Sequence, residues 1–205
     1  MSKYYSIPPQ LYDDQFWWKK DDIEFWKSVL LEDSTTKILE LGAGTGRIAG
    51  PLATAGADYT GLDISKEYVQ YAQQKFSKVK NIEFIQANMI DFNLKKTFDS
   101  IFIGFNSFLH LIENKDAYKC LNSVKKHMHA TTKLFIDIFV PHPLILYRPE
   151  NLKIHILDFY NNTSKKEQSI AELLRYNSQN EVADIEWYYA NEDGSITNTF
   201  IFKMK

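Results

Sequence analysis

One short segment constrains the fold of this chain more than any other, ILELGAGTGRIA at residues 38–49. Its apolar start runs into glycines at every second position, Gly42, Gly44 and Gly46. Glycine adopts positive φ angles without strain and lets another molecule contact the main chain closely. A strand, a glycine loop and a helix in this order are typical of nucleotide-binding α/β domains. The segment therefore predicts such a domain, with a strand over 36–42 and a helix over 46–56.

The following hundred residues repeat this alternation of apolar runs and amphipathic stretches. Ser65 is placed to cap one helix, in which apolar side chains recur at helical spacing. Apolar strands that alternate with helices indicate a parallel sheet buried on both faces. We therefore expect an α/β fold with a Rossmann-like, doubly wound, mostly parallel sheet. The expected strands are 58–65, 81–88, 98–105 and 132–140, and the expected helices are 20–32, 66–78 and 114–129.

The pattern changes after Pro141. Segments 168–177, 181–190 and 194–205 are rich in β-branched and aromatic residues, and the turn-forming stretches NSQN and NEDG separate them. This indicates a C-terminal antiparallel β-meander of three strands. A helix over 164–176 is the alternative, because Ser164 and Glu167 have capping-box spacing and apolar residues follow at intervals of three to four. Periodicity alone leaves the two readings open.

These patterns divide the chain into three predicted regions. Residues 1–35 form an aromatic N-terminal lid and helix, residues 36–140 form the nucleotide-binding core, and residues 141–205 form an antiparallel cap that contributes to a substrate pocket.

Composition excludes several classes of function. Lys and Arg number 24 against 26 Asp and Glu, a net charge of -2, so we expect no nucleic-acid partner. No apolar segment approaches the roughly 18 residues of a membrane helix, so we expect no membrane partner. Cys120 is the single cysteine, which excludes an internal disulfide and suits the cytoplasm. Without a cysteine pair or closely spaced histidines, no metal site is expected.

The residues around the glycine loop distinguish between two nucleotide ligands. A dinucleotide-binding loop reads G-x-G-x-x-G, whereas this loop reads G-x-G-x-G and follows Glu40. Asp63, at the end of the second predicted strand, can accept both hydroxyls of a ribose. A carboxylate beside the loop repels a pyrophosphate but attracts a ligand that carries an ammonium and a sulfonium. The residues therefore favour S-adenosylmethionine over NAD, and an NAD-dependent oxidoreductase is the weaker alternative.

A family resemblance points the same way. LELGAGTGR, GLDIS, ANMIDFNL, FDSIFIGFNSFLHL and KLFIDIF resemble, in this order, the successive motifs of class I S-adenosylmethionine-dependent methyltransferases, in particular the small-molecule group. The resemblance is strong over 36–140 and loose over 141–205. It implies S-adenosyl-L-methionine as cofactor, S-adenosyl-L-homocysteine as product, and methyl transfer to a nitrogen or oxygen atom of a small-molecule acceptor.

The resemblance also implies roles for individual residues. Glu40 and the glycine loop would face the methionine end of the cofactor, while Asp63 would hold the ribose and Ile64 would pack on the adenine. Asn88 stands where the family has an adenine-contacting aspartate; an Asn side chain can still accept from and donate to adenine. The implied cofactor-binding residues are Glu40, Gly42, Ala43, Gly44, Gly46, Arg47, Asp63, Ile64, Asn88, Met89, Phe105 and Asn106.

Methyl transfer chiefly requires alignment of the acceptor and exclusion of water, because the leaving group departs neutral. An acceptor that must lose a proton also needs a base. His110 is the candidate for that catalytic role, and the alternative is a histidine bonded to backbone. Aromatic side chains are expected to wall the acceptor pocket. The predicted substrate-binding residues are Tyr5, Tyr12, Trp17, Trp18, Asn106, His110, Tyr147 and Trp187.

The C-terminal segment departs from the family pattern. Relatives continue beyond the meander with a helix and a further hairpin strand, whereas this sequence stops at FIFKMK. A missing strand would leave an exposed sheet edge for a second subunit to cover, as in a homodimer. A shortened relative that binds S-adenosylmethionine without catalysis is therefore a second hypothesis.

Overall fold

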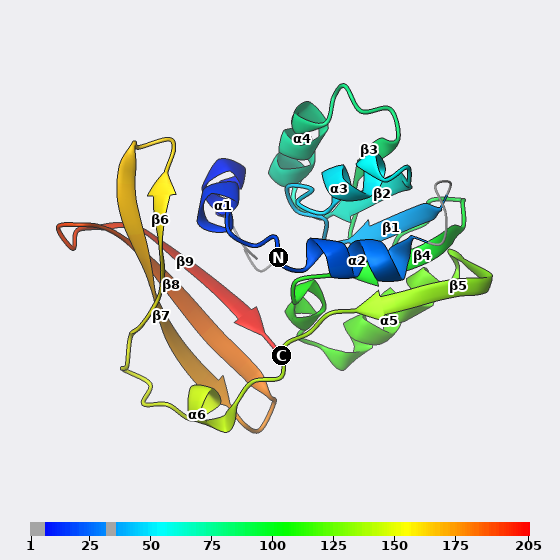
Figure 1. The fold of residues 1–205 in the computed structure, drawn as a ribbon. Coiled ribbons are helices and arrows are strands. Elements are labelled where there is room, and N and C mark those ends of the chain that lie inside the picture. The colour runs from blue at the N-terminus through cyan, green and yellow to red at the C-terminus, as the bar shows by residue number, and fades with distance from the viewer. Residues whose placement is uncertain (1–6, 32–35) are drawn as a thin grey trace. The chain divides into compact units, whose positions relative to one another are not determined.

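The computed structural model describes residues 7–31 and 36–205, and the chain divides into two compact units, each with its own sheet (Figure 1). We call Lys19–Phe108 with Glu113–Ile138 the parallel unit. The remainder, up to Trp18 and over Leu109–Ile112 and Phe139–Lys205, is the antiparallel unit.

The parallel unit contains a five-stranded sheet in the order β3-β2-β1-β4-β5, in which every neighbouring pair is parallel. Its strands are β1 (Lys37–Leu41), β2 (Asp58–Asp63), β3 (Ile82–Gln86), β4 (Phe98–Ile103) and β5 (Met128–Ile136). Its helices are α2 (Ile23–Leu30), α3 (Ala49–Thr54), α4 (Lys66–Lys75) and α5 (Asn114–Lys125), and the 3₁₀ turn η1 (Ser107–His110) follows β4.

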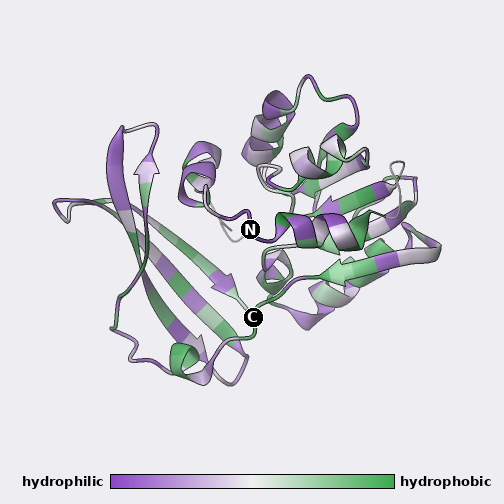
Figure 2. Cartoon of the chain, viewed as in Figure 1, coloured by the Kyte–Doolittle hydropathy of each residue, from purple (hydrophilic) through white to green (hydrophobic). Residues whose placement is uncertain are grey.

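Apolar side chains on both faces of the central strands hold this sheet between its helices. On one face Ile38, Tyr59 and Phe102 belong to a buried cluster with Trp26 of α2 and Leu52 of α3. Figure 1 shows α5 on the side of the sheet away from α2. Figure 2 shows hydrophobic residues along the strands of this sheet. The predicted doubly wound α/β fold is confirmed.

Several helix and strand boundaries differ from the predicted ones. The helix predicted over 46–56 is only α3, because the glycine loop occupies its first residues. The strand predicted over 132–140 is β5, which begins four residues earlier and ends at Ile136. Ser65 caps α4 as predicted, since its hydroxyl accepts the Tyr68 N–H at 3.3 Å.

The antiparallel unit contains a four-stranded sheet in the order β6-β7-β8-β9. Its strands are β6 (Ile154–Asn161), β7 (Lys166–Asn177), β8 (Val182–Asn191) and β9 (Ile196–Met204), with the short helices α1 (Pro9–Gln15) and α6 (Pro143–Leu146). The predicted meander is confirmed as β7–β9, and the sequence prediction missed β6. A helix over 164–176 is wrong, because Ile170 pairs with Tyr189 and Leu174 with Ile185 across a continuous ladder.

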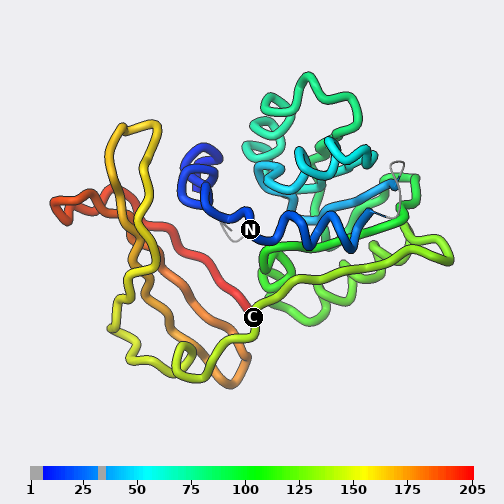
Figure 3. The backbone as a smooth tube through the Cα atoms, viewed as in Figure 1, coloured from blue at the N-terminus to red at the C-terminus, as the bar shows by residue number. Residues whose placement is uncertain are grey.

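Helix α1 packs on this sheet although about 150 residues separate it from its partners along the chain. Figure 3 shows its trace beside β6. Ile7 and Leu11 join a buried cluster with Phe159, Ile170 and Tyr189. Side-chain hydrogen bonds also fix α1, since the Asp14 carboxylate accepts the Asn162 N–H at 2.9 Å.

Among the helices that the structure describes, none is both long and apolar enough to span a membrane.

Candidate cofactor-binding site

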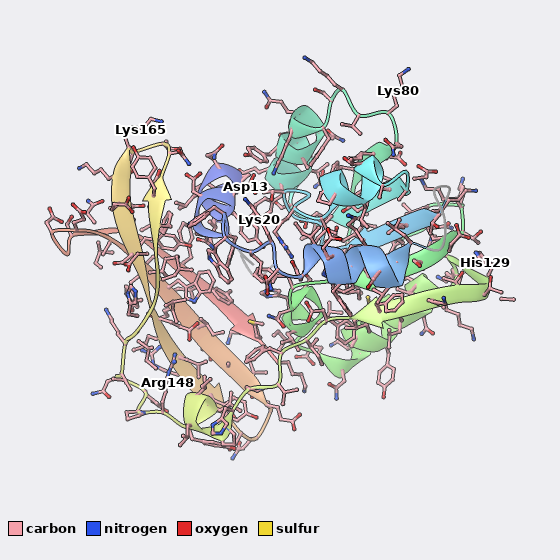
Figure 4. All side chains as sticks on the ribbon, viewed as in Figure 1. Asp13, Lys20, Lys80, His129, Arg148 and Lys165 are labelled. Carbon is pink, nitrogen blue, oxygen red and sulfur yellow. The ribbon has the colours of Figure 1, made fainter. Side chains whose placement is uncertain are left out.

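The strand order identifies the carboxyl ends of the strands in the parallel sheet as the place where a ligand is expected. Strands β2 and β3 are added on one side of β1 and strands β4 and β5 on the other, so the strand order reverses between β1 and β4. Ligands of open α/β sheets bind at the carboxyl ends of strands flanking such a point. The glycine loop follows β1, and a turn over 104–107 follows β4 (Figure 1). His129 lies at the start of β5, at the amino ends of the strands and so away from these loops (Figure 4).

The three loop glycines adopt φ angles of +76°, +55° and +75° at Gly42, Gly44 and Gly46. A methyl group at Gly42 would lie 2.8 Å from the Ser107 Cβ, and one at Gly46 would lie 2.6 Å from the Phe84 Cζ, so side chains are excluded at both. Apart from Gly44 and its two chain neighbours, no atom of the described residues lies within 4 Å of the corresponding point at Gly44. The main chain of Gly44 therefore borders open space, as contact with a ligand requires.

Asp63 connects this loop to the end of β2. One carboxylate oxygen accepts the Gly44 N–H at 2.9 Å and the other accepts the Ser65 N–H at 2.8 Å. The side chain is only 9% exposed, and burial raises its pKa although these N–H groups favour the charged form. Each oxygen retains a second lone pair that can accept a ribose hydroxyl.

Ile64 is the apolar residue beside Asp63. It is 58% exposed, unlike the apolar residues of the strand before it. An exposed apolar side chain next to a ribose-type acceptor fits an adenosine group, so the chemistry of these residues suits the adenosyl part of the expected cofactor.

Glu40 is buried rather than a surface carboxylate. It is 6% exposed and accepts a hydrogen bond from the Tyr59 hydroxyl. Burial raises the pKa of Glu40 to about 8, while the Tyr59 hydroxyl and the Arg47 guanidinium act in the opposite direction. The carboxyl is therefore mostly neutral at pH 7, and a nearby ammonium would favour its ionisation.

Arg47, the last residue predicted from the loop itself, has its guanidinium engaged by protein groups. It forms a two-pronged ion pair with Asp22 at 2.7 and 2.8 Å and donates to the Lys19 carbonyl. Burial opposes ionisation of Asp22, yet its pKa is lowered because the guanidinium bonds both oxygens. Arg47 thus attaches the start of α2 to the glycine loop, and a direct contact between this side chain and the cofactor stays a prediction.

Asn88 and Met89 follow β3. The Asn88 side-chain oxygen accepts the Ile90 N–H at 2.9 Å, so it closes a local turn. The Met89 methyl carbon lies 3.8 Å from the point that a Cβ of Gly42 would occupy. Met89 therefore lies against the glycine loop, whereas the adenine contact of Asn88 stays a prediction.

Phe105 and Asn106 form an unusual turn after β4. Both have positive φ angles, 51° and 64°, which non-glycine residues rarely adopt. Asp137, directly after β5, accepts the Phe105 N–H through its carboxylate at 3.0 Å. Sequence reasoning missed Asp137, whose only signal was a single carboxylate inside the strand predicted over 132–140.

The predicted substrate-binding residues lie in another part of the molecule. Apart from Asn106, those that the structure describes belong to the antiparallel unit, whereas every predicted cofactor residue belongs to the parallel unit. Tyr5 falls outside the described residues. Trp17, Trp18 and Tyr147 are exposed, and Tyr12 packs beside Phe16.

His110 bonds to backbone, which was the alternative to its catalytic role. Its Nδ1 donates to the Lys203 carbonyl at 3.2 Å, since a carbonyl can only accept. Burial lowers the pKa of the imidazole, although that hydrogen bond acts in the opposite direction. The lowered pKa favours the neutral ring, in which Nε2 is the basic nitrogen because Nδ1 carries the proton. A catalytic role of His110 stays a prediction.

Trp187 belongs to a polar cluster that sequence reasoning missed. The Glu172 carboxylate accepts its Nε1–H at 2.8 Å and, through the other oxygen, pairs with the Arg148 guanidinium at 2.8 Å. Glu172 lies between Ile170 and Leu174 on the apolar face of β7. The sequence signal for this cluster was Glu172, a charged residue at a position where the alternation of the strand predicts an apolar one.

Comparison with known proteins agrees with this geometry. Residues 38–130 match the family model described as a methyltransferase domain. YqeM of Bacillus subtilis (strain 168), provisionally named a methyltransferase, is 33% identical over 103 residues, which are 50% of this chain and 42% of that protein. This chain thus spans less than half of the length of the curated relatives that it matches.

Two solved structures share the fold at low sequence identity. The CcbJ methyltransferase from Streptomyces caelestis has a TM-score of 0.71 at 17% identity, over 89% of this chain and 72% of that one. The sugar N-methyltransferase KedS8 from Streptoalloteichus sp ATCC 53650 has a TM-score of 0.68 at 18% identity, over 91% and 72%.

The family match and the shared fold agree on one class of protein. Residues 38–130, which are less than half of this chain, match the methyltransferase family, and both of these solved structures are methyltransferases. These matches to methyltransferases favour S-adenosylmethionine over the NAD-dependent alternative.

Proposed function

We propose that this protein transfers a methyl group from S-adenosylmethionine to a nitrogen or oxygen atom of a small-molecule acceptor. One observation carries the proposal. Within the segment that matches the methyltransferase family, the main chain of Gly44 borders open space beside the Asp63 carboxylate and the exposed Ile64.

The residues at this end of the sheet have distinct roles in the proposal. Asp63 binds the ribose hydroxyls, and the hydrogen bonds that its carboxylate accepts from the Gly44 and Ser65 N–H groups keep the loop in place. Ile64 covers one face of the adenine, and Glu40 lies toward the methionine end. The bound cofactor supplies an electrophilic methyl group whose sulfur leaves as a neutral thioether. The protein's own task is then to bind, to orient the acceptor and to exclude water.

The acceptor requires a group that removes its proton when it reacts as an ammonium or a hydroxyl. His110 remains our proposed base, because its bond to the Lys203 carbonyl fixes the tautomer in which Nε2 is basic. Lowering of its pKa by burial favours the neutral ring that a base requires at pH 7.

We favour an amine-bearing small molecule as the acceptor. KedS8, named as a sugar N-methyltransferase, shares the fold over 91% of this chain, so its likeness includes the antiparallel unit. Aromatic side chains of that unit, Trp187 among them, suit the ring faces of a compact polar acceptor.

Two measurements test the function. Calorimetry with S-adenosylhomocysteine should show one binding site, and incubation with isotope-labelled S-adenosylmethionine and a panel of amino sugars, other amines and alcohols should give a labelled product. Binding with no product from the whole panel would favour the non-catalytic hypothesis. Absence of binding to the purified full chain would overturn the proposal altogether.

A further inference from the structure

The turn after β4 is conformationally strained. Phe105 and Asn106 are consecutive and both left-handed, and a left-handed conformation costs roughly 1–2 kcal/mol for a residue with a Cβ. Asn tolerates this region better than most residues, but a bulky aromatic does not. Such strain persists only where surrounding groups hold the backbone, and it occurs most often at functional sites.

Asp137 supplies three hydrogen bonds that hold this turn. Its carboxylate accepts the Phe105 N–H at 3.0 Å, its carbonyl accepts the Asn106 N–H at 3.2 Å, and its own N–H donates to the Ile103 carbonyl at 2.9 Å. The two backbone bonds would form with any non-proline residue at this position. The carboxylate bond is the one that depends on the Asp137 side chain, and it is made to the more strained residue.

The turn also contacts the glycine loop from two sides. Ser107, the next residue, occupies the space that a side chain at Gly42 would need. The Arg47 guanidinium lies 5.3 Å from the centre of the Phe105 ring, where a cation is attracted to an aromatic face. Because Asp22 fixes that guanidinium, the backbone at Phe105 and the shape of the loop depend on each other.

We propose that Asp137 is a positioning residue that holds Phe105 in its left-handed conformation and thereby shapes the glycine loop for the adenosyl cofactor. This inference rests on the proposed function. Asp137 acts through the turn and is not assigned a contact with the cofactor.

The first test measures the affinity for S-adenosylhomocysteine by calorimetry. D137A should weaken binding about tenfold, as expected for loss of a charge-assisted hydrogen bond. D137N retains an oxygen that accepts the Phe105 N–H, so its affinity should stay within about threefold of the unmodified chain. Affinity of D137A equal to that of the unmodified chain would overturn the inference.

A matched control separates positioning from general loss of stability. Asn81 lies at the other edge of the same sheet, where its amide donates to the Ala53 and Ala57 carbonyls at 2.9 and 2.8 Å. N81A should lower the unfolding temperature about as much as D137A yet leave the affinity within about twofold. If N81A weakens binding as much as D137A, the positioning role is wrong.

A second test needs no ligand. F105A and F105G both remove the ring, but only glycine is unstrained at positive φ. F105G should therefore unfold about 2–4 °C above F105A, the reverse of the usual order of these residues. An F105A variant as stable as F105G would overturn the strained turn. If the unmodified chain fails to bind S-adenosylhomocysteine, the proposed function fails, and this comparison still decides whether the turn is strained.

Discussion

The two units satisfy their polar side chains in different ways. At the strand ends of the parallel unit, Asp63, Asn88 and Asp137 each accept hydrogen bonds from main-chain N–H groups. On the sheet of the antiparallel unit, polar side chains chiefly bond to one another. Glu172 joins Arg148 and Trp187, and Gln168 joins Asn161 and Asn191.

This difference determines which changes each unit can tolerate. A side chain that bonds another side chain can be replaced together with its partner, and the pair leaves nothing unsatisfied. A side chain that bonds a main-chain N–H has a partner that no substitution other than proline removes. Loss of such a side chain always leaves a backbone donor without its acceptor. The antiparallel sheet should therefore tolerate paired replacement, whereas the candidate cofactor site should not.

The largest expected effect lies in the antiparallel unit. E172A should lower the free energy of unfolding by about 3–5 kcal/mol, because it leaves the guanidinium of Arg148 buried and unpaired. The two side chains are only 5% and 15% exposed, so water compensates poorly. The midpoint of urea unfolding measures the loss.

The paired replacement is the control for this comparison. In R148M/E172Q the charges disappear together and the Gln side chain can still accept the Trp187 N–H. The double variant should recover most of the stability that E172A loses. If it is as unstable as E172A, polar partners in this unit are not exchangeable and the contrast between the units fails.

The second largest effect concerns the parallel unit. D63A should weaken binding of S-adenosylhomocysteine by about 2–4 kcal/mol, since two ribose hydrogen bonds are lost and are not fully additive. The Gly44 and Ser65 N–H groups lose their acceptor as well, so the loop itself should become less ordered. Calorimetry of the purified variant measures the affinity.

D63N is the matched control at this position. It retains one oxygen acceptor but replaces the other with a donor that faces an N–H group. It should therefore recover only part of the affinity that D63A loses. Unlike the paired replacement of Arg148 and Glu172, no second substitution should restore the rest. Affinity of D63A equal to that of the unmodified chain would refute the assignment of Asp63 to the ribose.

How well each unit could be predicted follows from the same contrast. The glycine loop, Asp63 and the cap at Ser65 depend on neighbours that are close in sequence or at fixed positions in a parallel sheet. Their geometry could be anticipated from spacing alone. The docking of α1 depends on contacts between segments about 150 residues apart, such as Asp14 with Asn162. No local pattern encodes such contacts.

The candidate site shows the same limit on a smaller scale. The positions of Gly42 and Asp63 follow from the order of the strands. The role of Asp137 depends on the backbone conformation of Phe105, which no residue type announces, since left-handed turns normally carry glycine or asparagine. The burial of Glu40 against Tyr59 depends on the register of β1 with β2, which the strand limits alone leave open.

Glu40, like Asp22, differs from the carboxylates at the strand ends of the parallel unit because its partner is another side chain, and it gives the smallest of these effects. Its pKa of about 8 exceeds that of an unfolded carboxyl, so between about pH 5 and pH 8 the folded state binds one more proton than the unfolded state. The free energy of unfolding should therefore fall as pH rises, by about 1.4 kcal/mol per pH unit from this group.

E40Q removes this dependence while Tyr59 keeps an oxygen to which it can donate. Between pH 6 and pH 7.5 the unmodified chain should lose about 2 kcal/mol that E40Q does not lose. Urea unfolding at the two pH values measures it, and E192Q, which removes the same charge from an exposed turn, should behave as the unmodified chain does. Equal pH dependence in E40Q and the unmodified chain would mean that Glu40 is ionised in the folded protein. An ionised Glu40 in this buried position would have to be stabilised by a permanent neighbouring cation. The Glu40 carboxylate would then be charged before the cofactor binds, and binding of the ammonium would not require it to release a proton.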